Sequence, residues 1–240
     1  MLSIWIKVSF IQDKGQVDGY RMRFLNWGYD NYYGLQDIQK YNDERYVLDR
    51  ELILNKTFYN KIFKQQGNFV NYIITYSPHT PFTTEKEVGK ILAEEKYGKG
   101  NIPKLSEEDC AKMAASETDN MVGLLIQALK DNGLYDNTVI VAYADHYLYT
   151  LDDKSILDKY KETSNNLINH TPFFIWSSDL GQLTSISKVN MQMDILPTVL
   201  NLFGIDYNSN NYIGHDILSN DFKGYAFFSD YSWYDGKVYV

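Results

Sequence analysis

Apolar and polar residues alternate along the chain in short runs that predict strands and helices in turn. Residues 3–10 and 69–76 are rich in β-branched and aromatic side chains, which indicates buried strands. Residues 33–40 and 48–65 between them have helical spacing. This alternation predicts an α/β fold.

The clearest helix is predicted over residues 118–132, where apolar residues recur at i, i+3, i+4, i+7 and i+8 and Gly133 follows as a stop. One face of this helix should pack on a sheet. Residues 138–144 (TVIVAYA) are a continuous apolar run too short for a helix. Such a run is typical of a strand covered on both faces, so we predict a central parallel strand here.

The remaining segments are weaker in pattern. Residues 172–176 (PFFIW) predict a strand, and residues 194–203 predict a helix with Asp194 as its N-cap. Residues 84–110 are charged and weakly patterned, which predicts a surface excursion between strand and helix.

Length and charge narrow the class of protein. At 240 residues we expect a domain over residues 1–206 and a β-rich extension of it, ending in a hairpin, over residues 207–240. The formal net charge of −8 argues against nucleic acid as a partner, because a phosphate backbone requires clustered Lys and Arg.

Cys110 is the single cysteine, so the chain can form no internal disulfide. The sequence contains neither a signal peptide nor a run of ~18 apolar residues that would span a membrane.

Two predicted strands are followed by residues that could bind a ligand, because ligands gather at the carboxyl ends of parallel strands. Asp145 and His146 combine a carboxylate with an imidazole, which suits Mn²⁺ or Zn²⁺. His79 lies in a loop stiffened by Pro78 and Pro81. Each also has a structural interpretation: the Asp-His pair as a turn, and His79 as a residue that caps its loop.

Other polar residues have open roles as well. Thr150 could cap a helix over residues 151–160 or present its hydroxyl to a ligand. Asp119 is interpreted as a helix start. His170 and His215 are interpreted as structural or exposed.

Six motifs occur in a specific order along most of the chain. They are HTPF at 79–82, TD at 118–119, LKDNGLYDNTVI at 129–140, YADHY at 143–147, HTPFFI at 170–175 and DILPT at 194–198. Together, from about residue 9 to residue 219, they resemble the extracellular domain of lipoteichoic acid synthases, a sulfatase-like branch of the alkaline phosphatase superfamily.

This resemblance implies a fold and an activity. The fold would be an alkaline-phosphatase/sulfatase-like sheet with helices on both faces and a small C-terminal β subdomain. The activity would be metal-dependent phosphoglycerol transfer, in which glycerol phosphate passes from phosphatidylglycerol through a phospho-threonine to a cell-surface polymer. The expected location is the extracellular face of the cell membrane.

The resemblance also assigns site residues. Asp145 and His146 match the family's metal-binding pair, for which manganese is the usual ion. His79 matches the histidine that contacts the phosphate or glycerol, and Thr150 falls in the glycerol-phosphate pocket. Arg21 lies near the position of the family's substrate-binding arginine.

Several parts of the family pattern have no counterpart in these residues. The family's first strand and helix, its acidic metal ligand and its nucleophilic threonine would lie upstream of residue 1, and Ile11 aligns with a family histidine. We therefore expect an incomplete metal site, marginal stability in isolation, and turnover only with an N-terminal segment or chain supplied separately.

Four interpretations stay open, and the last of them is a purely structural remnant of the fold. The first is the phosphoglycerol transferase. The second is a sulfatase or phosphodiesterase type hydrolase, in which water takes the phosphoryl group. The third is a catalytically inactive remnant that binds a glycan or glycerol-phosphate polymer through His79 and a surface rich in the chain's 21 tyrosines.

Overall fold

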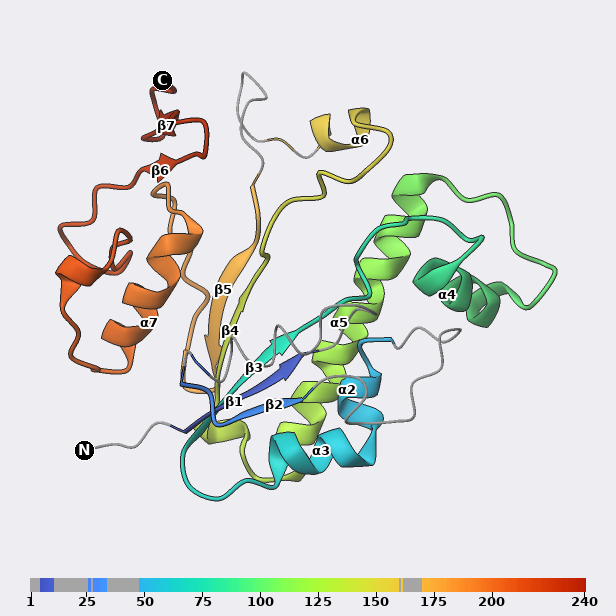
Figure 1. Cartoon of the computed structure of the whole chain (residues 1–240), viewed down its shortest axis with the longest axis horizontal. Helices are drawn as coiled ribbons and strands as arrows, with labels where there is room; N and C mark the ends of the chain where they lie inside the picture. Colours follow the sequence, from blue (N-terminus) through green and yellow to red (C-terminus); the bar gives the residue numbers. More distant parts are fainter. Residues whose placement is uncertain (1–4, 11–25, 27, 34–47, 160, 162–169) are drawn as a thin grey trace. The chain divides into compact units, whose positions relative to one another are not determined.

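The computed structural model describes residues 5–10, 26, 28–33, 48–159, 161 and 170–240 (Figure 1). The chain divides into two compact units, Met1–Asp179 and Leu180–Val240. The boundary predicted between residues 206 and 207 is of another kind, because it separates a domain from an extension of the same domain. That boundary stays a prediction.

The first unit contains a parallel sheet of three strands in the order β2-β1-β3 (Figure 1). The strands are β1 (Trp5–Phe10), β2 (Asn31–Tyr33) and β3 (Phe69–Ile74). The central strand pairs along its whole length with β3, from Trp5 opposite Phe69 onward. The strands predicted at residues 3–10 and 69–76 are therefore confirmed. The helix predicted over residues 33–40 falls outside the described residues from residue 34 on.

A second sheet of the first unit pairs β4 (Val139–Tyr143) with β5 (Phe173–Ser177). Both predicted strands exist, but the prediction of a central parallel strand at residues 138–144 was wrong, because β4 runs antiparallel to β5. The apolar run encodes burial and not strand direction, and here even the burial is partial. The Tyr143 hydroxyl donates to the Tyr72 hydroxyl at 2.9 Å, which joins β4 to β3.

The helix predicted over residues 48–65 is broken into α2 (Glu51–Leu54) and α3 (Lys56–Phe63). Asn55 separates them because its backbone is extended, with φ −71° and ψ 118°. Its side chain accepts from the Thr57 and Phe58 amides, which caps α3. The apolar faces of both helices pack against the longest helix in one core of buried residues: Leu52, Ile53, Phe58, Ile62, Phe63, Met121, Ala128 and Leu129.

That longest helix, α5 (Glu107–Asp131), is 25 residues long. Its predicted end at Gly133 is confirmed, since Gly133 has a left-handed φ of 65°. Its predicted start near Thr118 was wrong: Ser106 caps the helix in a capping box with Asp109. The first turns bury the small side chains of Cys110, Ala111 and Ala114, which give little hydrophobic signal in a sequence.

Residues 84–110 are more ordered than the predicted surface excursion. They contain α4 (Glu87–Tyr97), which buries Val88, Gly89, Leu92 and Ala93. Two further short helices among the described residues of this unit are the 3₁₀ turn η2 (Tyr135–Asn137) and α6 (Ser155–Asp158).

The second unit is built around α7 (Ile195–Leu202), preceded by the 3₁₀ turn η3 (Gln192–Asp194) and followed by η4 (Ser209–Asn211). The predicted helix is present, but Asp194 does not cap it with its side chain. That carboxylate instead accepts from the Met191 and His215 amides at 2.9 and 2.7 Å. The C-terminal hairpin is formed by β6 (Ala226–Phe227) and β7 (Trp233–Tyr234).

Across the residues that the structure describes, no helix is both long and apolar enough to span a bilayer.

Candidate functional site

Asp145 and His146 follow the end of β4, and their side chains face one another. The Asp145 Oδ2 atom lies 3.6 Å from the His146 Nε2 atom, and the side chains are 83% and 42% exposed. The His146 Nδ1 atom lies 2.8 Å from the Tyr147 carbonyl oxygen. Because a carbonyl can only accept, Nδ1 donates to it, and Nε2 is the ring nitrogen that lies on the side of the Asp145 carboxylate. The pair can therefore offer a cation one oxygen and one nitrogen ligand.

Aromatic rings within the same loop contact the His146 imidazole. Tyr149 packs edge-on against the His146 ring at 4.8 Å and against Tyr147 at 6.1 Å. Lys154 donates to the Tyr149 carbonyl oxygen. The imidazole is thus oriented by a hydrogen bond at Nδ1 and by a neighbouring ring, which is how outer contacts orient a metal ligand.

His79 is exposed on the turn that follows β3. Its backbone N–H donates to the Tyr76 carbonyl at 2.8 Å, and its ring stacks on the Tyr76 ring with centroids 4.9 Å apart. Its Nδ1 atom lies 2.7 Å from the Thr80 carbonyl oxygen. The Nε2 atom is therefore the one that a ligand would meet, as a donor when the ring is protonated and an acceptor when it is neutral.

The turn carrying His79 and the segment carrying Thr150 meet in one hydrophobic cluster. Phe82 comes three residues after His79, and Leu151 comes directly after Thr150. Both side chains are buried together against the start of α5 and against α6, with Cys110, Ala111 and Ile156. The structure thus brings two of the predicted site segments together through packing between their neighbours.

Two potential metal ligands, Asp145 and His146, lie together in the described part of the chain. Among the described residues, no group of three or more His, Cys, Asp and Glu side chains could hold an ion. Asp145 and His146 fit a divalent cation in donor type, and their role as metal ligands stays a prediction. Arg21 and Ile11 lie outside the described residues, so the substrate role of Arg21 stays a prediction.

A buried polar network behind the His79 turn was missed by the sequence analysis. Asp49 is 1% exposed and accepts from the Thr118 hydroxyl at 2.6 Å. The next residue, Arg50, binds Glu117 of α5 through its backbone N–H at 3.1 Å and its Nη1 atom at 3.2 Å. Burial raises the pKa of the Glu117 carboxyl, and the bonds from Arg50 oppose this shift. The only sequence signal was the Thr118 motif, interpreted then as a helix start.

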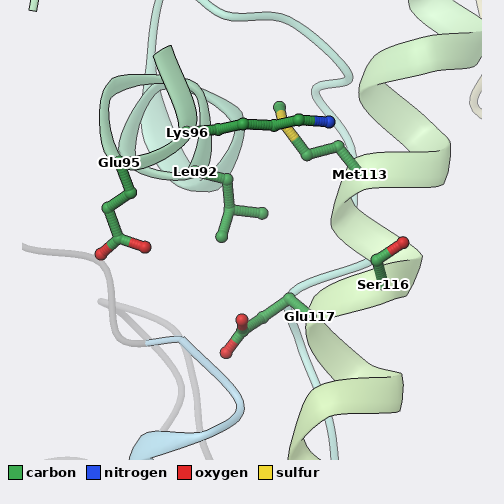
Figure 2. A pocket seen from close by; sticks show the side chains of 6 residues that line it. All are labelled: Leu92, Glu95, Lys96, Met113, Ser116 and Glu117. Carbon is green, nitrogen blue, oxygen red and sulfur yellow. The ribbon is translucent and has the colours of Figure 1, made fainter. Parts of the chain in front are cut away.

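A shallow pocket of about 290 Å³ opens between α4 and α5, beside this network (Figure 2). Figure 2 shows Glu95 and Glu117 pointing to the same side and Lys96 extending toward Met113. The Arg50 guanidinium bonds to both of these carboxylates. The lining of the pocket is Leu92, Glu95, Lys96, Met113, Ser116 and Glu117. The predicted site residues that the structure describes, His79, Asp145, His146 and Thr150, do not line this pocket.

Comparison with known families decides the class of the protein. The model of the sulfatase family matches residues 7–205, which is most of the chain. The chain belongs to the sulfatase family. The sequence-based assignment to a sulfatase-like family is therefore confirmed, and the match extends over the Asp145–His146 pair and His79.

Individual relatives of this sulfatase-family chain are lipoteichoic acid synthases. The synthase of Staphylococcus saprophyticus is 29% identical over 232 residues, which are 90% of this chain and 34% of that protein. The synthase of Staphylococcus aureus strain USA300 is 29% identical over 236 residues, 89% of this chain and 35% of that protein. The chain thus spans about a third of the length of these relatives.

Two solved structures share the fold of this sulfatase-family chain. The lipoteichoic acid synthase LtaP from Listeria monocytogenes superposes with a TM-score of 0.71 at 23% identity, covering 96% of this chain and 58% of that one. An alkaline phosphatase superfamily protein from Vibrio parahaemolyticus gives 0.64 at 18% identity, with 98% and 53% covered. The predicted α/β fold class of the alkaline phosphatase superfamily is confirmed. Members of the sulfatase family are generally metal-dependent.

Proposed function

We propose that this chain is the C-terminal part of a phosphoglycerol transferase of the lipoteichoic acid synthase type. It would take glycerol phosphate from phosphatidylglycerol, pass it to a glycerol-phosphate polymer, and work on the extracellular face of the cell membrane. The observation that carries the proposal is the Asp145–His146 pair, exposed at a strand exit with the imidazole Nε2 toward the carboxylate. The similarity to the staphylococcal synthases over nearly all of this chain supports the substrate class.

Asp145 and His146 would hold a divalent cation, which we propose is Mn²⁺. A cation bound there neutralises phosphoryl oxygens and lowers the pKa of a nucleophilic hydroxyl. His146 would bind the cation through its Nε2 atom, because its Nδ1 atom donates to the Tyr147 carbonyl and so fixes the orientation of the ring. The contribution of Asp145 is negative charge next to that nitrogen.

His79 and Thr150 would bind the glycerol phosphate. A protonated His79 ring can donate from Nε2 to a nonbridging phosphate oxygen, while Nδ1 stays bonded to the Thr80 carbonyl. Thr150 is half-buried beside Leu151, and its hydroxyl can exchange hydrogen bonds with a glycerol hydroxyl. The nucleophile and the acidic ligand would come from a preceding N-terminal segment.

The proposal is tested by transfer from a fluorescent phosphatidylglycerol. The full chain is mixed with the N-terminal segment of the Staphylococcus aureus synthase, Mn²⁺ and a glycerol-phosphate acceptor, and the lipid product and the extended acceptor are separated. We expect Mn²⁺-dependent diacylglycerol release and a longer acceptor, both lost in Asp145→Ala and reduced in His79→Ala.

The products separate the competing functions. Diacylglycerol release with free glycerol phosphate and no extended acceptor would indicate the hydrolase. No release in the mixture, with glycerol phosphate still bound by the chain, would indicate the inactive binding remnant. Either result would contradict the transferase.

A further inference from the structure

We propose that Asp49 is a positioning residue for His79, held in turn by Thr118 in the middle of α5. The inference rests on the proposed function, in which His79 contacts glycerol phosphate. Asp49 is 1% exposed, so it acts through the backbone of the turn and not on a ligand.

Asp49 and the turn after β3 hold each other by hydrogen bonds in both directions. The Asp49 Oδ1 atom accepts from the Tyr76 N–H at 2.7 Å and from the Ser77 N–H at 3.0 Å. In return, the Asp49 N–H donates to the Ser77 Oγ atom at 2.9 Å. Ser77 is fully buried. Three hydrogen bonds therefore fix two successive residues at the point where the chain leaves the sheet.

Tyr76 transmits this restraint to His79. The same residue that donates its N–H to Asp49 accepts the His79 N–H on its carbonyl at 2.8 Å. Its ring also lies nearly parallel to the imidazole, with an interplanar angle of 22°. Two hydrogen bonds and one ring contact thus lead from a buried carboxylate to an exposed imidazole. A ligand group needs such support to keep its geometry within a fraction of an ångström.

The other oxygen of Asp49 is held by α5. The Thr118 hydroxyl donates to Oδ2 at 2.6 Å, and the preceding residue, Glu117, binds both the backbone and the guanidinium of Arg50. Glu117 and Thr118 of α5 therefore bind Arg50 and Asp49, the two residues that precede α2. This gives Thr118 a role that its position within a long helix does not otherwise require.

The conservative replacement of Asp49 discriminates positioning from simple stability. In Asp49→Asn, the amide oxygen can still accept from the two turn N–H groups, while the amide nitrogen can donate to the Thr118 hydroxyl. In Asp49→Ala, the Tyr76 and Ser77 N–H groups and the Thr118 hydroxyl all lose their acceptor. Asp194→Ala is the matched control, since Asp194 is also 1% exposed and also accepts from two backbone N–H groups, but in the other unit.

The experiment records the ¹⁵N–¹H imidazole signals of His79 in the metal-free full chain, then titrates glycerol phosphate by calorimetry into the chain mixed with the N-terminal segment and Mn²⁺. We expect Asp49→Ala to shift the His79 signals and to weaken glycerol phosphate binding about tenfold, the lower end of what outer contacts of a ligand group contribute. Asp49→Asn should keep the wild-type signals and most of the affinity. Should Asp49→Ala not fold, Thr118→Val removes one of the donors and should shift the same signals by less.

The inference is overturned if the His79 signals of Asp49→Ala are unchanged, or those of Thr118→Val if Asp49→Ala does not fold. An equal shift in Asp194→Ala would overturn it as well. Failure of the proposed function is a different result. If His79→Ala binds glycerol phosphate as tightly as the wild type, or if the wild type does not bind it, the substrate role of His79 falls. The imidazole signals then still decide whether Asp49 positions the ring.

Discussion

Replacing Leu151 by alanine should strongly destabilise the first unit. The Leu151 side chain is 1% exposed and packs with Phe82, Cys110 and Ile156. Losing three carbons costs about 2.4 kcal/mol at ~0.8 kcal/mol per buried methylene. The cavity left behind adds to this, so the free energy of unfolding should fall by about 3 to 4 kcal/mol.

Urea denaturation followed by far-UV circular dichroism measures this loss. With an m-value of about 3 kcal/mol/M, the midpoint of Leu151→Ala should fall by about 1 M. The matched control is Leu183→Ala, because Leu183 is fully exposed. That control should change the free energy of unfolding by no more than about 0.5 kcal/mol.

The result bears on the site as well as on stability. Leu151 connects the Thr150 segment to the turn of His79 through Phe82. At urea concentrations where Leu151→Ala is still folded, the His79 imidazole signals should broaden, while those of Leu183→Ala stay as in the wild type. A loss below about 1 kcal/mol would refute the argument that this cluster joins the two segments, because a filled core site does not cost so little.

Three further predictions test separate parts of the fold. Ser106→Ala removes the cap of α5 and should lower the free energy of unfolding by about 1 kcal/mol in the same urea assay. Burial raises the pKa of Glu117 above its ordinary 4.5, so its contribution to stability is full below pH 4.5 and is lost as the pH rises through the folded-state pKa. Thermal unfolding measured from pH 4 to 8 should therefore show a smaller decrease in stability with pH for Glu117→Gln than for the wild type. A Cβ on Gly89 would lie 2.1 Å from the Thr83 carbonyl oxygen, so Gly89→Ala should cost about 2 kcal/mol, whereas Gly123→Ala, with no described atom within 4 Å, should gain about 0.5 to 1 kcal/mol.

The sequence predicted most elements whose signal is local. Regular apolar spacing from Met121 to Leu129 identified the second half of α5. Content of β-branched and aromatic residues identified β3, and a continuous apolar run identified β4. The first half of α5 was missed because Cys110, Ala111 and Ala114 are small. The direction of β4 was wrong because pairing depends on β5, about thirty residues away, and not on its own composition.

The same difference between local and long-range signals applies to the candidate site. Asp145, His146 and His79 could be proposed as candidates from sequence because they follow predicted strands, and their roles stay predictions. Asp49 could not, because its partners Ser77 and Thr118 lie 28 and 69 residues away. An aspartate just before a short helix is interpreted from sequence as a cap or a turn. Only the folded chain shows that it is buried and bonded to the His79 turn.

The central claim is that Asp145 and His146 are part of a divalent metal site. The most direct test is a calorimetric Mn²⁺ titration of the full chain, alone and mixed with an N-terminal segment that supplies an acidic ligand and a threonine. We predict saturable binding in the mixture, much weaker binding by the chain alone, and none in the mixture made with Asp145→Ala. Absence of binding in both wild-type samples, or binding that survives in Asp145→Ala, would contradict the account.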